Sequence, residues 1–335
     1  MEALPASQLP TGPAWQYEPK WDGFRCLAFR DSRRVDLLSK SGKSLTRYFP
    51  ELVQALVALS AKQFVLDGEI VIPVDASLSF DQLLMRIHPA ASRIKKLSES
   101  SPSLFICFDL LVDEHGVPLV KEPLVRRRKA LERFAKLYFK ASKALRLSPT
   151  TDDLAVARQW FQIAVALDGV MAKRFDLPYQ SGLRTGMQKI KKQRTADCVV
   201  GGFRYLEKKP LVGSLLLGLY NDEGQLDHVG FTSSIRAADR PALTKQLKPM
   251  IKPPGFDGRA PGGPSRWSTK RSSEWEPLTP RLVVEVQFDH FTGGRFRHGT
   301  KFLRWRPDKA PEDCTLKQVE RENSSALNLL TDIGS

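Results

Sequence analysis

Lys20 stands two residues before the pair Asp22-Gly23, in the segment Glu18-Pro19-Lys20-Trp21-Asp22-Gly23-Phe24-Arg25. A lysine amine attacks only as the neutral base, so a site that uses one covalently must remove water or place other cations nearby. Lys189 and Lys191 can supply such cations, because side chains alternate along a strand and these two would point to one face. An exposed basic strand edge is the alternative. The spacing favours a nucleophilic amine held beside a phosphate.

Two carboxylates interrupt the apolar run from Phe64 to Ile72. Asp67 and Glu69 are two residues apart and would share a strand face. Buried carboxylates are expensive unless they bind a cation or hydrogen-bond donors, and a single buried ion pair is the competing interpretation. Mg²⁺ prefers one or two carboxylates together with phosphate oxygens, and Glu69 with Asp168 could provide them, with Mn²⁺ as the alternative ion.

The net charge of +15 and the pI of about 9.7 indicate a polyanionic partner, and nucleic acid is the polyanion we expect. A generally basic enzyme without such a partner is the alternative. Basic and aromatic side chains alternate near the C-terminal end, in a pattern that suits a groove or a clamp on a phosphate backbone. They are Phe291, Arg295, Phe296, Arg297, Lys301, Phe302, Arg304, Trp305, Arg306 and Lys309.

The four cysteines, Cys26, Cys107, Cys198 and Cys314, form no paired motif. This argues against structural zinc and against a disulfide framework, and it fits a reducing compartment. No apolar run long enough to span a membrane occurs, and the first thirty residues contain no export signal. We expect a cytoplasmic protein that associates with the nucleoid through its function, without a membrane partner.

The elements that must position these residues fall into two groups. Up to about residue 194, short β-rich runs alternate with helical patterns, as in a mixed α/β domain. Expected strands are 24–30, 35–39, 64–72, 104–111, 170–174 and 187–192, and expected helices are 51–62, 126–139 and 152–167. Phe108 lies in one of these apolar strands, where a core position is the default. Only the surrounding motifs make it a candidate for stacking on a base.

Beyond residue 194 the pattern becomes mainly β, with expected strands at 196–203, 211–220, 227–231 and 282–288 and one helix at 239–250. Residues 251–273 are rich in Pro, Gly and basic residues, which predicts a surface loop. About five strands and one helix are compatible with an OB-type barrel. The expected fold class is α+β, with a mixed α/β domain over 1–194 and a β-rich OB-fold domain over 195–335.

Six motifs in order resemble those of the covalent nucleotidyltransferases. They are Lys20-Trp21-Asp22-Gly23, Leu66-Asp67-Gly68-Glu69, Cys107-Phe108-Asp109-Leu110-Leu111, Asp168-Gly169-Val170-Met171-Ala172-Lys173, Lys189-Ile190-Lys191 and Arg306-Pro307-Asp308-Lys309. Within that superfamily the chain is similar to the short bacterial ATP-dependent DNA ligases of the LigC type. That narrower resemblance depends mainly on residues 194–202 and 293–299.

The resemblance implies that Lys20 attacks the α-phosphate of ATP and that AMP then passes to a DNA 5′-phosphate, so that a 3′-hydroxyl can seal the nick. It also implies roles for individual residues. Glu18 would contact the adenine edge, Phe108 and Met171 would sandwich the base, and Arg25 and Glu69 would hold the ribose and metal side. Lys40, Lys189 and Lys191 would face phosphate, and Asp168 would assist the metal. Arg306, Asp308 and Lys309 would close over the triphosphate, and Lys40, Arg295, Arg297, Lys301 and Arg304 would contact DNA.

The chain departs from the wider family at two positions in this set. Asp168 stands where glutamate is usual, which shortens the reach of the carboxylate toward a metal. Lys40 stands where arginine is more frequent, which removes a bidentate phosphate fork. Only nineteen residues precede Lys20, so we expect a weak, salt-sensitive grip on DNA.

Other functions remain open on the residues alone. An RNA ligase or a GTP-using capping enzyme would use Lys20 in the same covalent role. A nucleic-acid-binding protein with a decayed adenylation site is a rival of another class. The expected partner is nicked duplex DNA, with a repair polymerase or an end-binding protein as a further partner, and the expected state is a monomer.

Overall fold

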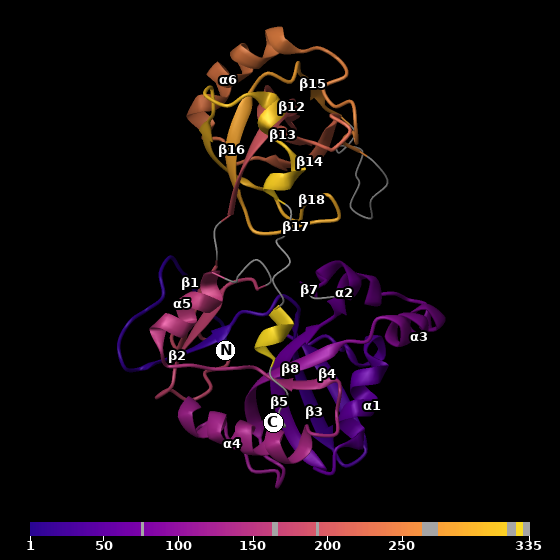
Figure 1. Cartoon of the computed structure of the whole chain (residues 1–335), viewed down its shortest axis with the longest axis vertical. Coiled ribbons are helices and arrows are strands. Elements are labelled where there is room, and N and C mark those ends of the chain that lie inside the picture. The colour runs from indigo at the N-terminus through magenta and orange to yellow at the C-terminus, as the bar shows by residue number, and fades with distance from the viewer. Residues whose placement is uncertain (75–76, 163–166, 192–193, 263–273, 320–325, 331–335) are drawn as a thin grey trace. The chain divides into compact units, whose positions relative to one another are not determined.

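Two groups of strands, separated in the sequence, organise the chain (Figure 1). Unit 1 comprises Met1–Lys192 with Arg321–Ser335, and unit 2 comprises Gln193–Glu320. The computed structural model describes residues 1–74, 77–162, 167–191, 194–262, 274–319 and 326–330. In the described part of the chain, no helix is both long and apolar enough to cross a membrane.

The larger sheet of unit 1 has the strand order β4-β3-β5-β8-β9. Its strands are β3 (Phe24–Asp31), β4 (Arg34–Ser39), β5 (Gln63–Val71), β8 (Leu104–Val112) and β9 (Leu145–Leu147). Helices α1 (Pro50–Ala58) and α4 (Leu124–Tyr138) bury Leu52, Leu56, Leu131 and Phe134 in the same core as this sheet. The register places Arg25 opposite Glu69, and Gly68 between Cys26 and Cys107.

The smaller sheet of unit 1 has the order β1-β11-β10-β2. Its strands are β1 (Leu4–Ala6), β2 (Trp15–Pro19), β10 (Val170–Arg174) and β11 (Met187–Ile190). Helix α5 (Leu154–Gln162) packs Ala157 and Trp160 against Tyr17, Val170 and Ala172. The remaining elements of the unit are η1 (Thr46–Tyr48), β6 (Pro73–Val74), β7 (Ser77–Leu78), α2 (Phe80–Arg86), α3 (Ala91–Ser100) and η6 (Ala326–Leu329).

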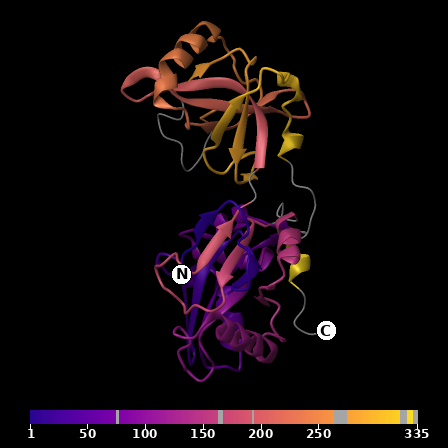
Figure 2. The same ribbon diagram turned by 90° about the vertical axis from the view of Figure 1, so that its left-hand side faces the viewer.

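Unit 2 is rich in strands, as Figure 2 shows. Its main sheet runs β14-β13-β12-β16-β19, with β15 also paired to β12. The edge strands β14 and β19 approach each other at Thr232 and Thr300, where Thr232 Oγ1 donates to the Thr300 carbonyl at 2.9 Å. A sheet whose two edges meet in this way closes toward a small barrel.

The elements of unit 2 are these. The strands are β12 (Arg194–Leu206), β13 (Lys209–Tyr220), β14 (Leu226–Thr232), β15 (Glu276–Pro277), β16 (Val283–Phe288), β17 (Phe291–Thr292), β18 (Arg295–Phe296) and β19 (Lys301–Trp305). The helical elements are η2 (Ala237–Asp239), α6 (Arg240–Leu247), η3 (Lys248–Met250), η4 (Pro311–Asp313) and η5 (Leu316–Gln318).

The predicted α+β fold class is confirmed, and each expected strand has a counterpart. The helix expected at 51–62 is shorter, because it ends at Ala58 and the chain turns into β5. Residues 251–262 contain neither helix nor strand, while 263–273 lie outside the described residues. The boundary at 194 placed everything after it in the second domain, whereas Leu327, Leu329 and Leu330 pack on the apolar core of unit 1.

His228 on β14 predicts how the stability of unit 2 depends on pH. Burial and the nearby cations Arg204, Arg295 and Arg259 lower its pKa to about 4, and its Nε2 has no hydrogen-bond partner in the described chain. The unfolded chain takes up a proton near pH 6.5 and the folded unit only near pH 4, so the free energy of unfolding should fall as the pH drops through that window. Amide hydrogen exchange of β13 and β14 at pH 7 and pH 5 measures it.

His228→Gln should remove that part of the pH dependence, whereas the same change at the exposed His115 of unit 1 should leave it intact. An equal loss of protection in the wild type and in His228→Gln between pH 7 and pH 5 would contradict the assignment to His228.

Candidate active site

Lys20 is the first residue after β2 and is fixed by two backbone hydrogen bonds. Its N–H donates to the Gly169 carbonyl, and its carbonyl accepts from the Asp168 N–H, both at 2.9 Å. Gly169 has a φ of 131°, and a Cβ there would lie 2.0 Å from the Ile190 carbonyl oxygen. Only glycine fits this crossing. The motif around Asp168 therefore positions the backbone of Lys20.

Positive charges gather around one carboxylate at this point. The Nζ of Lys20 forms an ion pair with Asp168 Oδ2, and the Nζ of Lys191 lies 3.1 Å from the same oxygen. Burial lowers the pKa of Lys189, and Lys191, Lys20 and Lys40 lower it further. Lys189 on β11 and Lys191, which follows the last residue of β11, thus belong to the same charge cluster. Such a cluster favours an incoming phosphate.

Eight of the residues predicted to bind nucleotide line a single pocket in unit 1. They are Glu18, Lys20, Arg25, Lys40, Glu69, Phe108, Met171 and Lys189. Lys40 lies at its exposed side, where its Nζ is 3.3 Å from Glu2 Oε1. Asp168 and Lys191 adjoin the pocket through their ion pairs with each other and with Lys20.

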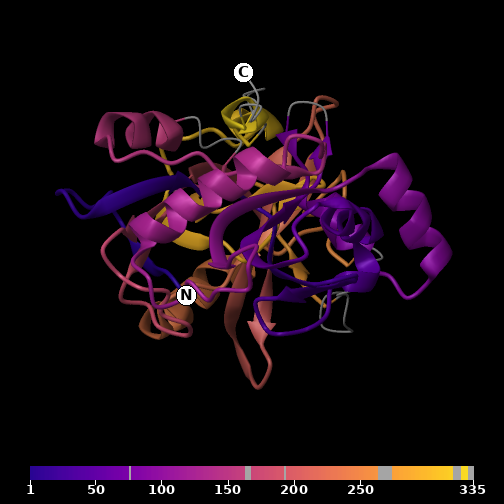
Figure 3. The same ribbon diagram turned by 90° about the horizontal axis from the view of Figure 1, so that it is seen from below.

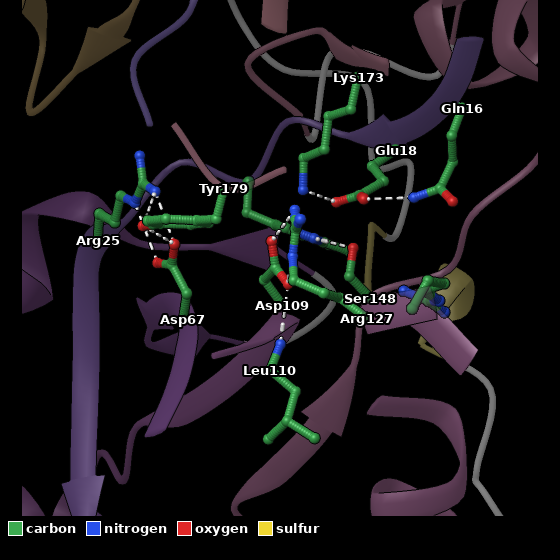
Figure 4. A network of polar contacts seen from close by, with 12 residues as sticks. Gln16, Glu18, Arg25, Asp67, Asp109, Leu110, Arg127, Ser148, Lys173 and Tyr179 are labelled. Atoms are coloured by element: carbon green, nitrogen blue, oxygen red, sulfur yellow. Dashed lines mark hydrogen bonds and ion pairs between the residues drawn. The ribbon is translucent and has the colours of Figure 1, made fainter. Parts of the chain in front are cut away.

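One end of the pocket combines an aromatic face with a buried ion pair between Glu18 and Lys173, and Figure 4 shows the ion pair. Phe108 is half-buried while its neighbours Cys107 and Asp109 are buried, so its ring faces the pocket and is no core residue. Glu18, 2% exposed, accepts from Lys173 Nζ at 2.7 Å and from Gln16 Nε2 at 2.9 Å. The Lys173 ammonium also lies 4.4 Å from the centre of the Phe108 ring.

The two carboxylates of β5 have different partners. Arg25 donates to both oxygens of Asp67, at 3.0 and 2.6 Å, and the Tyr179 hydroxyl donates to Asp67 at 2.8 Å. Asp67 therefore forms a buried ion pair, which the sequence analysis named as the alternative to binding a cation. Arg127 and Asp109 form a second bidentate pair nearby (Figure 4), and the Arg127 guanidinium carbon lies 5.6 Å from the centre of the Tyr179 ring.

Glu69 is the carboxylate that fits a cation. It makes no hydrogen bond or ion pair with any residue that the structure describes, and burial raises its pKa to about 8. Glu69 is half-buried in the pocket wall, and a desolvated carboxyl without donors is stabilised when a metal ion supplies the opposite charge. Asp168 adds a second hard oxygen donor beside Lys20. The donor set therefore fits Mg²⁺, which prefers carboxylate and phosphate oxygens.

The other predicted residues lie in unit 2. Arg306 Nη1 donates to Asp197 at 2.8 Å and Arg306 Nη2 to Asp308 at 2.8 Å, while Lys309 Nζ lies 3.8 Å from Asp313. Lys301 and Arg304 are exposed on β19, where Arg304 Nε lies 2.6 Å from Glu285. Arg295 is exposed on β18, and Arg297 follows it half-buried.

Sequence reasoning missed Lys173, Tyr179 and the Asp109–Arg127 pair. Lys173 could have been found, because it follows Met171 by two residues and therefore shares its strand face. Tyr179 lies between β10 and β11 in a segment without periodicity, and no sequence signal marks it.

Comparison with known proteins gives a consistent result. The family model "ATP dependent DNA ligase domain" matches residues 6–191, and "ATP dependent DNA ligase C terminal region" matches 208–309. DNA ligase C1 of Mycolicibacterium smegmatis is 44% identical, covering 91% of this chain and 88% of the relative. DNA ligase C of Mycobacterium tuberculosis is 40% identical, covering 94% and 92%. A solved structure from a study of Lig E DNA ligases shares the fold, with a TM-score of 0.54 at 15% identity, covering 91% of this chain and all of that one.

Proposed function

The chain belongs to the ATP-dependent DNA ligase family, and we propose that the pocket around Lys20 is where it takes up AMP. The enzyme is an ATP-dependent DNA ligase that seals nicks, of the short bacterial LigC type. The observation that carries the site assignment is the ion pair of Lys20 with Asp168, together with the place of Lys20 in the lining of the pocket beside Glu18, Phe108 and Met171. The first domain is the adenylation domain, and the strand-rich second domain has an OB-type fold.

The chemistry proceeds in three transfers at phosphorus. Lys20 Nζ forms a bond to the α-phosphorus, the bond to the bridging oxygen breaks, pyrophosphate leaves, and the amine loses a proton to solvent. An oxygen of the DNA 5′-phosphate then attacks the same phosphorus, and the Lys20 amine leaves and regains a proton. Finally the 3′-hydroxyl attacks the activated 5′-phosphorus, losing its proton as AMP departs.

Side chains around Lys20 stabilise the charge that these transfers move. Asp168 orients the ammonium before attack, and Lys189 and Lys191 neutralise the α-phosphate. Glu69, with Asp168, would hold Mg²⁺ or Mn²⁺, which supplies charge neutralisation at the phosphates when bound. Arg25 would hold the ribose side, and Lys40 would face the reacting phosphate and the DNA.

Glu18 and Lys173 together offer an acceptor beside a donor, at the end of the pocket where Phe108 and Met171 would enclose a base. Adenine presents the complementary pattern, an N6 amino donor beside an N1 acceptor, whereas guanine presents O6 as acceptor and N1–H as donor. We assign the choice of ATP over GTP to this pair. Lys173 is thus a further binding residue besides those named from the sequence.

Lys173→Met should lower the efficiency of lysyl-adenylate formation about 10- to 100-fold, because a charged hydrogen bond worth about 1.5–3 kcal/mol is removed. The KM for ATP and for GTP in that step measures it. Glu18→Gln should raise the use of GTP relative to ATP, since an amide can turn its NH₂ toward O6. Lys62→Met, at an exposed lysine of the same unit, should change neither constant, and an unaltered ATP-to-GTP ratio in both pocket variants would refute the assignment.

Unit 2 carries the groups proposed for the triphosphate and for duplex DNA. Arg306 and Lys309 would orient the pyrophosphate, and Arg295, Arg297, Lys301 and Arg304 would contact the DNA backbone, supported by the exposure of Arg295, Lys301 and Arg304. We further propose that the enzyme acts in DNA repair as a cytoplasmic monomer. Its partner would be a repair polymerase or an end-binding protein.

The test of this function combines two nucleotides with two substrates. Purified enzyme with Mg²⁺ is given ATP or GTP and a nick in DNA or in RNA, and both protein labelling and joining are followed. Labelling by ATP and sealing of the DNA nick are expected. Preference for GTP would favour a capping enzyme, and preference for the RNA nick would favour an RNA ligase.

A further inference from the structure

Tyr179 lies outside the helices and strands of unit 1, in the segment between β10 and β11, and yet its side chain lines the pocket around Lys20. Its hydroxyl donates to Asp67 Oδ2 at 2.8 Å and accepts from Arg25 Nη2 at 3.2 Å. Burial and the charge of Asp67 raise the pKa of Tyr179 above its usual value, so the hydroxyl keeps its proton and remains a donor. Figure 4 shows Tyr179 joined in this way to both partners of the Arg25–Asp67 ion pair.

The position of Tyr179 is set by the core of unit 1. Its backbone N–H donates to the Val120 carbonyl at 2.9 Å, and the guanidinium carbon of Arg127 lies 5.6 Å from the centre of its ring. Arg127, 1% exposed, is held in turn by both oxygens of Asp109, at 2.9 and 3.0 Å. Arg127 belongs to α4 and Asp109 to β8, and Figure 1 and Figure 3 show these two elements side by side. The ring is therefore fixed although its own segment has no regular structure.

Arg25 has one nitrogen left for a ligand. Its Nε and Nη2 donate to the two oxygens of Asp67, and Nη2 also donates to Tyr179. Nη1 donates to the carbonyl of Met1, which lines the same pocket, at 2.6 Å. This nitrogen carries two N–H groups, and among the residues that the structure describes the Met1 carbonyl is their only acceptor. The other N–H of Nη1 is therefore the group that Arg25 can offer to a ribose.

We propose that Tyr179 is a positioning residue for the ribose of ATP, and that it acts through Arg25. Its hydroxyl holds Arg25 and Asp67 together, so that Nη1 is in place before the nucleotide arrives. A donor that is held in advance loses less conformational entropy when the ligand binds. Tyr179 takes no part in the transfers at phosphorus. The inference rests on the proposed AMP pocket and on the proposed place of Arg25 at the ribose.

The test compares two tyrosine variants of the full-length enzyme with two nucleotides. Tyr179→Phe removes the hydroxyl and keeps the ring beside Arg127. The control is Tyr138→Phe, at a half-buried tyrosine of α4 whose ring packs on Phe134. After treatment with pyrophosphate to remove any bound AMP, each protein receives Mg²⁺ with ATP or with 2′,3′-dideoxy-ATP, which lacks both ribose hydroxyls. The KM and the maximal rate of lysyl-adenylate formation are measured for each pair.

With ATP, Tyr179→Phe should raise the KM about 3- to 10-fold, the scale of one hydrogen bond, and should leave the maximal rate nearly unchanged. With the dideoxy nucleotide the same variant should leave the KM as in the wild type, because the hydroxyl that Arg25 would hold is missing. Tyr138→Phe should match the wild type with both nucleotides. The preference for ATP over the dideoxy nucleotide should therefore narrow in Tyr179→Phe alone.

A structural role would give a different result. Loss of folded enzyme lowers the maximal rate with both nucleotides and leaves the KM unchanged, and a distorted pocket raises the KM equally for both. Either result, or an unchanged KM for ATP, would overturn the proposal. A wild type with the same KM for both nucleotides would overturn the place of Arg25 at the ribose and, with it, this inference. Absence of lysyl-AMP from the wild type would count against the whole active-site assignment.

Discussion

Lys20→Ala should abolish labelling of the protein by ATP and should reduce joining of an ordinary nick by roughly a million-fold, the scale seen when an enzyme loses its nucleophile. The reason is chemical, because Lys20 supplies the amine that lies between Asp168 and the pocket. Asp168 would still have Lys191 as partner, at 3.1 Å, so the carboxylate is not left alone. Release of labelled pyrophosphate and joining of a labelled nick measure the two effects.

The same variant should still seal a nick whose 5′-phosphate already carries AMP, because that step needs no covalent lysine. This control separates a defect in chemistry from a defect in folding. Lys129→Ala, at an exposed lysine of α4, should behave as the wild type in both assays. Joining of the ordinary nick by Lys20→Ala at a normal rate would refute the covalent assignment.

Arg25→Met should destabilise unit 1 by about 3–5 kcal/mol, because it removes the bidentate partner of Asp67, whose side chain is only 1% exposed. The nucleotide pocket should lose its function as well, since Arg25 and Asp67 both line it. Urea unfolding followed by amide exchange of β3 and β5 reports the stability, and ATP labelling reports the function.

The double variant Arg25→Met, Asp67→Leu should recover most of the stability, because no uncompensated charge remains, but should not recover labelling. Arg34→Ala, which removes a surface ion pair with Asp36 on the same strand, should cost no more than about 1 kcal/mol. If the double variant were as active as the wild type, Arg25 would be purely structural and its proposed role at the ribose would be wrong.

Local pattern predicted two pairs of the site, whereas the roles of most other site residues came from the resemblance to the ligase family. Alternation along single strands predicted that Lys189 and Lys191 would act together and that Asp67 and Glu69 would share a face, and both pairs lie as expected. Alternation alone could not say which carboxylate had a partner. Arg25, on the adjacent strand β3, pairs with Asp67 and not with Glu69, and this depends on the directions of the side chains, which alternation does not specify.

Contacts between distant segments were beyond such reasoning. Lys173 meets Glu18 because β10 and β2 pair antiparallel with Met171 opposite Glu18, a register that no local pattern encodes. Strand β19 was missed because three of its five residues are exposed and its buried and exposed positions do not alternate regularly. Its sequence therefore lacks the period of two that predicts a strand. Helix α3 was missed in turn, since it has no side-chain N-cap and buries only Ile94 and Ser98.

The most direct test of the account is mass spectrometry of the enzyme after incubation with ATP and Mg²⁺, with peptide mapping of the adduct. We predict a single AMP on the peptide that contains Lys20, and its loss when nicked DNA is added. Enzyme purified with AMP already attached should release it to pyrophosphate and then accept it again. AMP on another residue, or no adduct even after pyrophosphate treatment, would contradict the central claim.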